Sequence, residues 1–350
     1  MTRPFPLWIC LFFLSLPASP RQAATPASRI TLDVVVNDKS GNPVSGLEQQ
    51  NFTILDNKQP QKILSFEAIG GNGAANADLE TILVIDAVNI GLTRVAFARE
   101  EIQKFLRQDG GKLARPLSID FLSDSGLIGQ ETPSRDGDAL IAYMNQHQTA
   151  LRTLRRSQGF YGAADQVQLS LRALGQLAQY EENRPGRKIV IWVSPGWPML
   201  TGPNVQLTSK DQQNLFSTVV AVSTQLRQSR IALYAVDPLG TSDAGSFRTF
   251  YYEQFLKGVT SPNRVVIGNL ALQVLAYQSG GRVLKSSNDV AGEIEHCIRD
   301  ANTYYVVTYD PPPADGPDDY HAIEVKLDQP QLKAQTRSGY YAQPTRPRTP

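Results

Sequence analysis

Two neighbouring residues near the end of the chain, His296 and Cys297, are a base and a nucleophile of the kind that thiol enzymes combine. Catalysis would require the imidazole to lie against the thiol, but neighbours on a helix project about 100° apart and do not face each other. Cys297 instead falls on an apolar stripe at helical spacing with Val290 and Ile294. We therefore expect Cys297 to be a small residue of the core and not a nucleophile.

The other patterns that carry catalytic or cofactor chemistry are incomplete. The chain has three histidines, His147, His296 and His321, and none stands at the spacing of zinc ligands. The segment Ser194-Pro195-Gly196 follows a predicted strand, but it lacks the Gly-x-Ser-x-Gly pattern of a nucleophile elbow. No spaced glycines follow Asp86, so the pattern of a phosphate-binding loop is missing. The sequence predicts a protein that is not an enzyme.

Length and composition indicate a globular protein with more than one domain. The chain has 350 residues, of which 41% are hydrophobic and 19% are charged, and a single core seldom grows beyond about 250 residues. The 34 basic and 33 acidic residues nearly cancel. Binding to nucleic acid or to anionic membranes is driven by excess positive charge, so we expect neither as a partner.

The first 24 residues have the features of a secretory signal peptide. Arg3 supplies a positive charge, an apolar run extends from Leu7 to Leu16, and alanines near the end offer cleavage positions. The run is too short to span a bilayer comfortably. We predict that residues 1–24 are removed and that the mature chain is exported, periplasmic or secreted, without a membrane span. Cys297 then remains alone and forms no internal disulfide.

Residues 29–69 have the pattern of a small β-module. Apolar residues alternate from Ile30 to Val36, and turn-forming residues follow. Two further segments, Phe52 to Leu55 and Ile63 to Phe66, are joined by a turn-rich stretch and are expected to form a hairpin. Residues 70–77 are rich in Gly, Asn and Ala and are interpreted as a flexible linker.

Residues 78–302 alternate strands and helices, as expected of an α/β domain. Continuous apolar runs predict buried strands, and a 3.6-residue periodicity predicts helices between them. The predicted strands are Thr81–Ile85, Leu117–Leu122, Lys188–Val193, Ile231–Val236 and Arg282–Lys285. The predicted helices include the segments Val95–Leu106, Ala139–Met144, Val167–Ala178, Leu215–Leu226, Leu270–Tyr277 and Asp289–Ala301. Right-handed crossovers then give a doubly wound, mostly parallel sheet with helices on both faces.

A long loop, Leu239–Asn263, interrupts this alternation. It contains an aromatic cluster from Phe247 to Phe255, which fits either a lid packed on the core or a recognition surface. In the helix before this loop, Ser209 and Gln212 resemble a capping box at the start.

Residues 303–342 return to β-structure. Three strands are predicted, Tyr304–Tyr309, His321–Leu327 and Lys333–Tyr341, as an antiparallel meander that packs with the N-terminal module. Residues 343–350 are rich in Pro and Arg and are expected to be a disordered tail.

The order of these elements resembles the von Willebrand factor A (VWA) domain, and more specifically the bacterial VWFA-related domain proteins first described in acidobacteria. The residues that carry the resemblance are Asp33–Asp38, Gly41, Pro43-Val44, Gly46-Leu47, Asn51-Phe52, Gln61–Ile63, Phe66, Ser279–Arg282, Tyr304–Pro311 and Gly339–Ala342. The resemblance covers nearly the whole mature chain, and the order of the motifs is more specific than any one of them. It implies a VWA-type, Rossmann-like α/β fold with an accessory β-module formed by the N-terminal and C-terminal segments.

Members of this family carry a metal-ion-dependent adhesion site, with an Asp-x-Ser-x-Ser motif after the first strand and a Thr and an Asp from two later loops. The corresponding segment here is Asp86-Ala87-Val88-Asn89-Ile90, so aliphatic residues occupy both hydroxyl positions. The later loops contain Gly159-Phe160-Tyr161-Gly162 and Ser194-Pro195-Gly196. Mg²⁺ needs several hard oxygen ligands, and only Asp86 remains. The resemblance implies a degenerate site without a metal ion or other cofactor.

Ligands bind open α/β sheets at the carboxyl ends of the strands. The candidate binding residues at this edge are Asp86, Asn89, Tyr161, Ser194 and Asp237. We predict that the chain binds another protein or a cell-envelope component there, without catalysis or metal. One alternative is a metal-dependent adhesion or assembly factor that binds a partner's carboxylate through Mg²⁺ at Asp86. Another is a scaffold whose β-module and tail do the binding.

Overall fold

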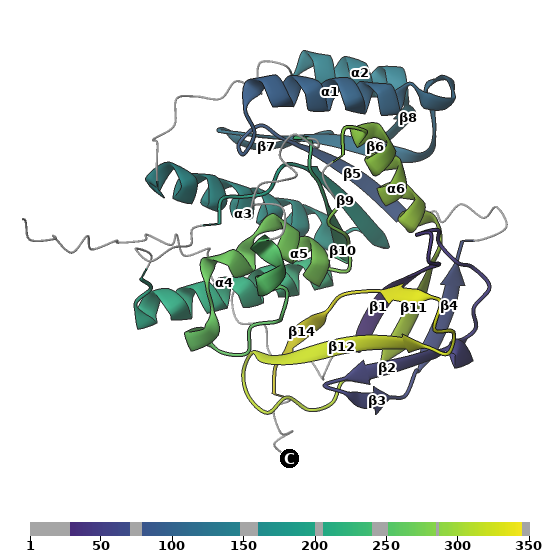
Figure 1. The fold of residues 1–350 in the computed structure, drawn as a ribbon, viewed down its shortest axis with the longest axis vertical. Coiled ribbons are helices and arrows are strands. Elements are labelled where there is room, and N and C mark those ends of the chain that lie inside the picture. Colours follow the sequence, from purple (N-terminus) through teal and green to yellow (C-terminus); the bar gives the residue numbers. More distant parts are fainter. Residues whose placement is uncertain are drawn as a thin grey trace, which may run out of the picture.

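The computed structural model describes residues 29–70, 79–147, 160–199, 206–239, 251–284 and 287–344. The predicted signal peptide, most of the predicted linker and most of the predicted tail lie outside these residues. Figure 1 shows two parts, a helix-flanked sheet and a smaller β-module packed beside it. Within the described residues, no helix is both long enough and apolar enough to cross a membrane.

A mostly parallel sheet forms the centre of the α/β part. Its strands follow the order β10-β9-β5-β6-β7, and β8 pairs with β6. The strands are β5 (Leu79–Asp86), β6 (Lys112–Ser123), β7 (Gly126–Gly129), β8 (Ser134–Asp136), β9 (Arg187–Val193) and β10 (Ile231–Val236). The three strands β5, β9 and β10 are buried along nearly their whole length. The predicted doubly wound, mostly parallel sheet is confirmed.

Helices cover both faces of this sheet (Figure 1). One face packs against α1 (Leu92–Leu106), α2 (Gly137–Gln146) and α6 (Val290–Asn302). The other packs against α3 (Phe160–Glu182), α4 (Ser209–Gln228) and α5 (Leu272–Gln278). Because successive side chains of a strand point to opposite faces, Leu83 of β5 joins the first core and Val84 joins the second.

The β-module is a sandwich of two antiparallel sheets, each with four strands. The first has the order β13-β1-β11-β4, formed by β1 (Ile30–Asn37), β4 (Ser65–Ile69), β11 (Tyr304–Tyr309) and β13 (Lys333–Gln335). The second has the order β14-β12-β2-β3, formed by β2 (Phe52–Asp56), β3 (Gln59–Gln61), β12 (Asp319–Leu327) and β14 (Gly339–Ala342). Inward-facing residues such as Leu32, Ile54 and Val307 form one shared core. The predicted accessory module from both ends of the chain is therefore confirmed.

Two predicted pairings within the module are wrong. β2 forms its hairpin with β3, across a turn at Asn57 and Lys58 in which both residues have positive φ, and β4 pairs with β11 in the other sheet. The C-terminal strands do not form a meander, because β11 and β13 flank β1 whereas β12 and β14 belong to the second sheet. Apolar alternation predicts strands but does not choose between two sheets that offer the same kind of inner face.

In the α/β part, two short strands were missed and two local predictions need correction. The short antiparallel strands β7 and β8 were not predicted. The capping box of α4 begins one residue earlier than expected, with Thr208 as the cap and Asp211 as its reciprocal partner. The predicted strand Arg282–Lys285 is reduced, within the described residues, to a single bridge between Val283 and Ala235.

Candidate functional site

The carboxylate of Asp86 ends β5 at the carboxyl edge of the sheet and is completely buried. Its Oδ1 accepts hydrogen bonds from the backbone N–H groups of Val88 (2.9 Å) and Asn89 (3.0 Å). Its Oδ2 accepts from Asn89 Nδ2 (2.7 Å) and from the indole Nε1 of Trp192 (3.0 Å). Four donors thus surround one carboxylate, and its two oxygens have about four acceptor positions.

Asn89 extends this network to α3. Its Nδ2 also donates to Ser170 Oγ (2.8 Å), and the Ser170 hydroxyl donates to the carbonyl oxygen of Gln166 (2.8 Å). Gln166 Nε2 donates back to the carbonyl oxygen of Val88 (3.0 Å). The loop after β5 is therefore fixed to α3 through its backbone and its side chains. Asn89 Oδ1 is buried and has no hydrogen-bond partner in the described part of the chain.

Ser194 begins the loop after β9, the strand next to β5. Its hydroxyl accepts from the N–H of Gly196 (3.3 Å), and its backbone N–H donates to the carbonyl oxygen of Val236 (2.9 Å). Gln273 of α5 donates to the carbonyl oxygen of Pro195 (3.1 Å). Ser194 is only 1% exposed, so its side chain stabilises the turn and is not available to a partner.

The remaining predicted binding residues are Asp237 and Tyr161. Asp237 follows β10, is partly exposed, and accepts a hydrogen bond from the N–H of Leu239 (2.9 Å). Tyr161 lies near the start of α3, and its side chain falls outside the described residues. The structure thus brings Asp86 and Asn89 into direct contact, while Ser194 and Asp237 each order the loop that follows their own strand.

The residues around Asp86 do not fit a magnesium ion as they stand. Mg²⁺ requires a near-octahedral shell of oxygens. Val88 and Ile90 stand where a metal-ion-dependent adhesion motif would have hydroxyls; they are 2% and 7% exposed and pack in the hydrophobic cores. The carboxylate faces N–H donors on both oxygens. Among the described residues, no cluster of three or more His, Cys, Asp or Glu is arranged to hold a metal ion.

Cys297 lies in the core, as predicted. It is fully buried in one cluster with Val290 and Ile294, and burial raises the pKa of its thiol well above the ordinary value. His296 lies instead beside Arg282, with 3.3 Å between Nε2 and the guanidinium Nη1. A buried, protonated thiol is a poor nucleophile, so the adjacent pair is not arranged for catalysis.

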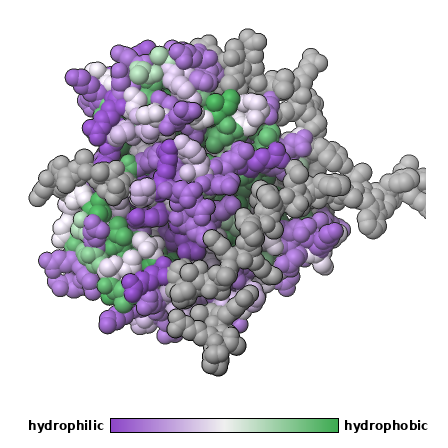
Figure 2. Space-filling view, turned by 180° about the vertical axis from the view of Figure 1, so that it is seen from behind, coloured by the Kyte–Doolittle hydropathy of each residue, from purple (hydrophilic) through white to green (hydrophobic). Residues whose placement is uncertain are grey.

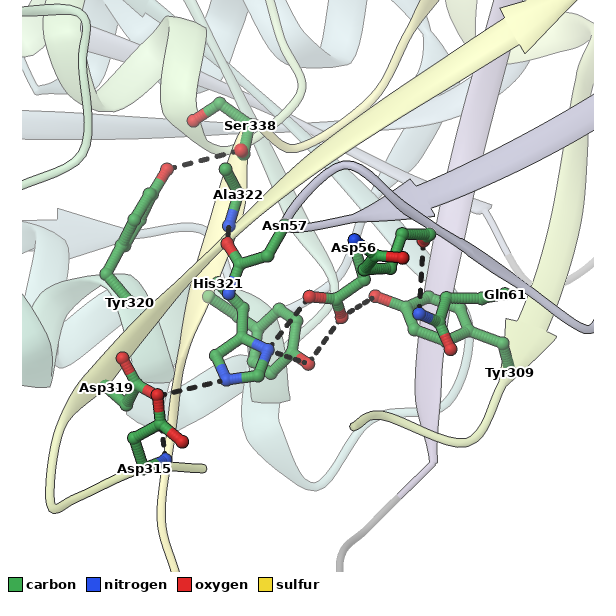
Figure 3. Close-up of polar contacts among 12 residues, drawn as sticks. Asp56, Asn57, Gln61, Tyr309, Asp315, Asp319, Tyr320, His321, Ala322 and Ser338 are labelled. Carbon is green, nitrogen blue, oxygen red and sulfur yellow. Dashed lines mark hydrogen bonds and ion pairs between the residues drawn. The ribbon is translucent and has the colours of Figure 1, made fainter. Parts of the chain in front are cut away.

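A second buried polar cluster lies in the β-module, where the sequence analysis placed no functional residue (Figure 3). Asp56 is fully buried, and its Oδ1 lies 2.8 Å from Nδ1 of His321. Its Oδ2 accepts from the hydroxyls of Tyr309 (2.9 Å) and Tyr340 (2.7 Å). Nε2 of His321 lies 3.4 Å from Oδ2 of Asp319. Figure 3 shows His321 and Tyr309 on either side of the Asp56 carboxylate, and Asp319 beyond the imidazole of His321.

This Asp56 cluster joins the two sheets of the sandwich. Tyr309 belongs to β11 of the first sheet, whereas Asp56, His321 and Tyr340 belong to the second. Burial raises the pKa of both tyrosines, so each hydroxyl keeps its proton and donates it to the carboxylate. One signal in the sequence could have revealed the cluster. Asp56 and His321 stand two residues from Ile54 and Ile323, and therefore on the inward face of alternating strands.

No protein-family model and no curated protein matches the chain. Among solved structures, the pilus adhesin SpaC from Lactobacillus rhamnosus GG is similar over 86% of this chain and 49% of that chain, with 9% identity and a TM-score of 0.36. This chain thus spans about half the length of the adhesin. The SpRpn10 VWA domain is similar over 46% of this chain and 74% of its own, with 14% identity and a TM-score of 0.25. The human COPII-coat protein Sec24c is similar over 76% and 44%, with 9% identity and a TM-score of 0.32. Likenesses this distant carry no argument about binding.

Part of the predicted aromatic cluster is described, as the 3₁₀ helix η6 (Tyr251–Phe255). It packs on α5, and the ring of Phe255 lies so close to Gly268 that an added Cβ would come within 2.6 Å of it. Tyr251 remains 40% exposed. The segment therefore packs against α5 and Gly268, while the side chain of Tyr251 stays partly exposed. The opposite face of the molecule from that of Figure 1 is largely hydrophilic where it is described, with hydrophobic residues in small separate groups (Figure 2).

Proposed function

We propose that the chain is an exported, non-enzymatic, VWA-like binding protein that recognises another protein or a cell-envelope component without a metal ion. The observation that carries the metal-free mode is the hydrogen bond from Trp192 Nε1 to Asp86 Oδ2. A cation at Asp86 would have to displace this indole N–H, which is buried with the rest of the Trp192 side chain. A buried donor that loses its acceptor costs about 1–3 kcal/mol.

The recognition surface in this proposal is the set of loops at the carboxyl edge of the sheet. Asp86 and Ser194 are buried and hold the backbone of these loops. Binding loops on a rigid scaffold are held in this way. Gly91, in the loop after β5, is exposed, and an added Cβ would meet nothing within 4 Å. A larger residue at Gly91 therefore reaches solvent and blocks a partner without disturbing the fold.

Calorimetric titration of residues 25–350 with Mg²⁺ and Mn²⁺ tests the metal-free mode. We expect no saturable binding. Saturable binding that Asp86→Ala removes would support the metal-dependent adhesion factor instead.

Capture of partners from an envelope extract, with a chelator present, tests the surface. We expect the unchanged chain to retain its partner and Gly91→Arg to lose it. Gly316→Arg is the matched control, since Gly316 lies in the β-module and an added Cβ there also meets nothing within 4 Å. Loss of the partner in Gly316→Arg alone would favour the scaffold in which the module binds. Deletion of residues 29–69 would be less informative, because β1 and β2 are paired with C-terminal strands.

A further inference from the structure

A small cavity lies where the β-module meets the amino ends of β9 and β10. The α/β part lines it with Arg187, the first residue of β9, with Arg230, just before β10, and with Gly280. The module lines it with Asp33 of β1 and with Thr336 and Arg337, which connect β13 to β14. The free space is about that of one water molecule.

Positive charge exceeds negative charge at this cavity. Three arginines line it, against the single carboxylate of Asp33, and Arg230 already forms an ion pair with that carboxylate. Arg187 is 1% exposed, donates from Nη1 to the carbonyl oxygen of Asp300 (3.3 Å) and lies over the ring of Tyr304. Neither contact is a hydrogen bond to a carboxylate, and the nearest buried carboxylate, that of Asp300, already forms an ion pair with Arg282 (2.8 Å) and attracts Arg187 only through space.

Arg337 is the least compensated of the three arginines. It is 8% exposed, and within the described ranges its guanidinium makes no hydrogen bond or salt bridge. Burial, together with the nearby cation Arg227, lowers its pKa to about 10. Arg337 is therefore still charged at neutral pH. The carboxylate that attracts Arg337 is that of Asp33, which already forms an ion pair with Arg230. One carboxylate is thus shared between two mostly buried cations, and this position favours a further counter-ion.

Two further donors at the cavity are unused. Nε of Arg187 and the hydroxyl oxygen of Thr336 are buried and have no hydrogen-bond partner in the described part of the chain. The first belongs to the α/β part and the second to the module. An acceptor placed between them would satisfy both and would join the two parts of the molecule.

We propose that this cavity binds one small inorganic anion of about the size of chloride, held by Arg187, Thr336 and Arg337. Chloride is slightly larger than the water-sized free space, so the arginines must move apart a little to admit it, and much further to admit a tetrahedral oxyanion such as phosphate. A water molecule would satisfy the hydroxyl but leave the excess positive charge uncompensated. The anion stabilises the docking of the β-module on the α/β part, since its ligands come from both.

Thermal unfolding of residues 25–350 tests this site, with sodium gluconate replaced stepwise by sodium chloride at constant ionic strength. We expect the melting temperature to rise and to saturate, because a ligand of the folded state stabilises it according to its occupancy. Arg337→Gln and Thr336→Val are expected to weaken the apparent chloride affinity, by about tenfold or more for the arginine. Arg107→Gln, an exposed arginine at the end of α1, is the control and should titrate like the unchanged chain. A rise that does not saturate, or that is the same in all variants, would be a general salt effect and would overturn the proposal.

Crystals soaked in sodium bromide give a direct readout, since bromide replaces chloride and scatters anomalously. We expect a peak between the guanidinium groups of Arg187 and Arg337, and no peak there in Thr336→Val/Arg337→Gln crystals. If the arginine variant does not fold, Thr336→Val alone supplies the comparison in both experiments. Bromide found only at other surface positions would exclude the site.

Discussion

Trp192 donates its indole N–H to the buried carboxylate of Asp86 over 3.0 Å, which links the ends of two neighbouring parallel strands. The second tryptophan of this region, Trp197, packs edge-on against it with 5.4 Å between ring centroids. The N–H of Trp197 is also buried but has no partner among the described residues. The two side chains thus have similar burial and differ in one hydrogen bond.

This difference predicts unequal effects of the same substitution. Trp192→Phe removes a donor from a buried carboxylate, whereas Trp197→Phe removes a donor that is not used. We expect Trp192→Phe to lower the free energy of unfolding by about 1–3 kcal/mol more than Trp197→Phe does. Denaturant unfolding followed by fluorescence measures both, because each variant keeps the other tryptophan. Equal losses would show that the hydrogen bond to Asp86 contributes nothing.

The Asp56 cluster predicts coupling between two tyrosines. Tyr309 and Tyr340 both donate a hydrogen bond to Oδ2 of Asp56. When either tyrosine is replaced by Phe, the other still supplies one hydrogen bond to this oxygen. We expect Tyr309→Phe and Tyr340→Phe to cost about 1–2 kcal/mol each. The double variant should lose at least about 0.5 kcal/mol more than the sum, as neighbours that share one partner do. Strictly additive losses in denaturant unfolding would argue against a shared carboxylate.

Because the carboxyl group of Asp120 in β6 is buried, we expect the folded chain to lose stability as the pH rises. Burial raises its pKa from 3.8 to about 7, so the folded chain binds this proton more tightly than the unfolded chain does. The stabilisation is complete below pH 4 and is lost as pH rises through about 7. Asp120→Asn should therefore match the unchanged chain at pH 4 and exceed it at pH 8, by on the order of 1–3 kcal/mol. Burial also raises the pKa values of Glu181 and Glu293 to about 7. The stability of Asp120→Asn should therefore still fall with rising pH, but less steeply than that of the unchanged chain.

Chemical denaturation at a series of pH values checks this prediction. Glu131→Gln is the control, since Glu131 is exposed in the loop after β7. A parallel pH dependence in Asp120→Asn and the unchanged chain would contradict the assignment.

Gly280 lies at a close contact between the α/β part and the β-module. Its φ is +90°, and an added Cβ would lie 2.7 Å from the backbone nitrogen of Arg337 and 2.9 Å from the carbonyl carbon of Thr336. We expect Gly280→Ala to destabilise the chain by more than about 1 kcal/mol, because both the dihedral angle and the contact oppose it. Gly316→Ala, which meets nothing within 4 Å, should be neutral within about 0.5 kcal/mol. A neutral Gly280→Ala in thermal unfolding would mean that the module does not dock as described.

Much of the α/β part could be predicted because its signals are local. The apolar run before Asp86 gives a buried strand, and the stripe that includes Cys297 gives a helix face. The strands β7 and β8 were not predicted because they are short and have mixed burial. Their pairing with β6 depends on tertiary contacts and not on a run of apolar residues.

The candidate site was predicted in part for a similar reason. The loss of hydroxyls at Val88 and Ile90 can be read from the residues alone. The donors that satisfy Asp86 cannot, because Trp192 reaches it from a strand that lies far along the chain. To predict the Asp56 cluster, one would have to know how the first strands of the chain pair with the last ones. The predicted meander instead placed those last strands together in a single sheet.

The interleaving of the module also determines when each part of the chain can fold. β1 has β11 on one side and β13 on the other, so both of its hydrogen-bonding edges stay unpaired until these two strands have been made, about 270 residues or more later in the sequence. The α/β part lies between the two halves of the sandwich in sequence, so all of its residues are made before the second half of the sandwich. A chain cut short after α6 thus carries a finished insert attached to strands with bare edges, and bare edges promote aggregation. The strands from β11 to β14 thus close the sandwich, because they pair with both edges of β1 and with one edge of β2.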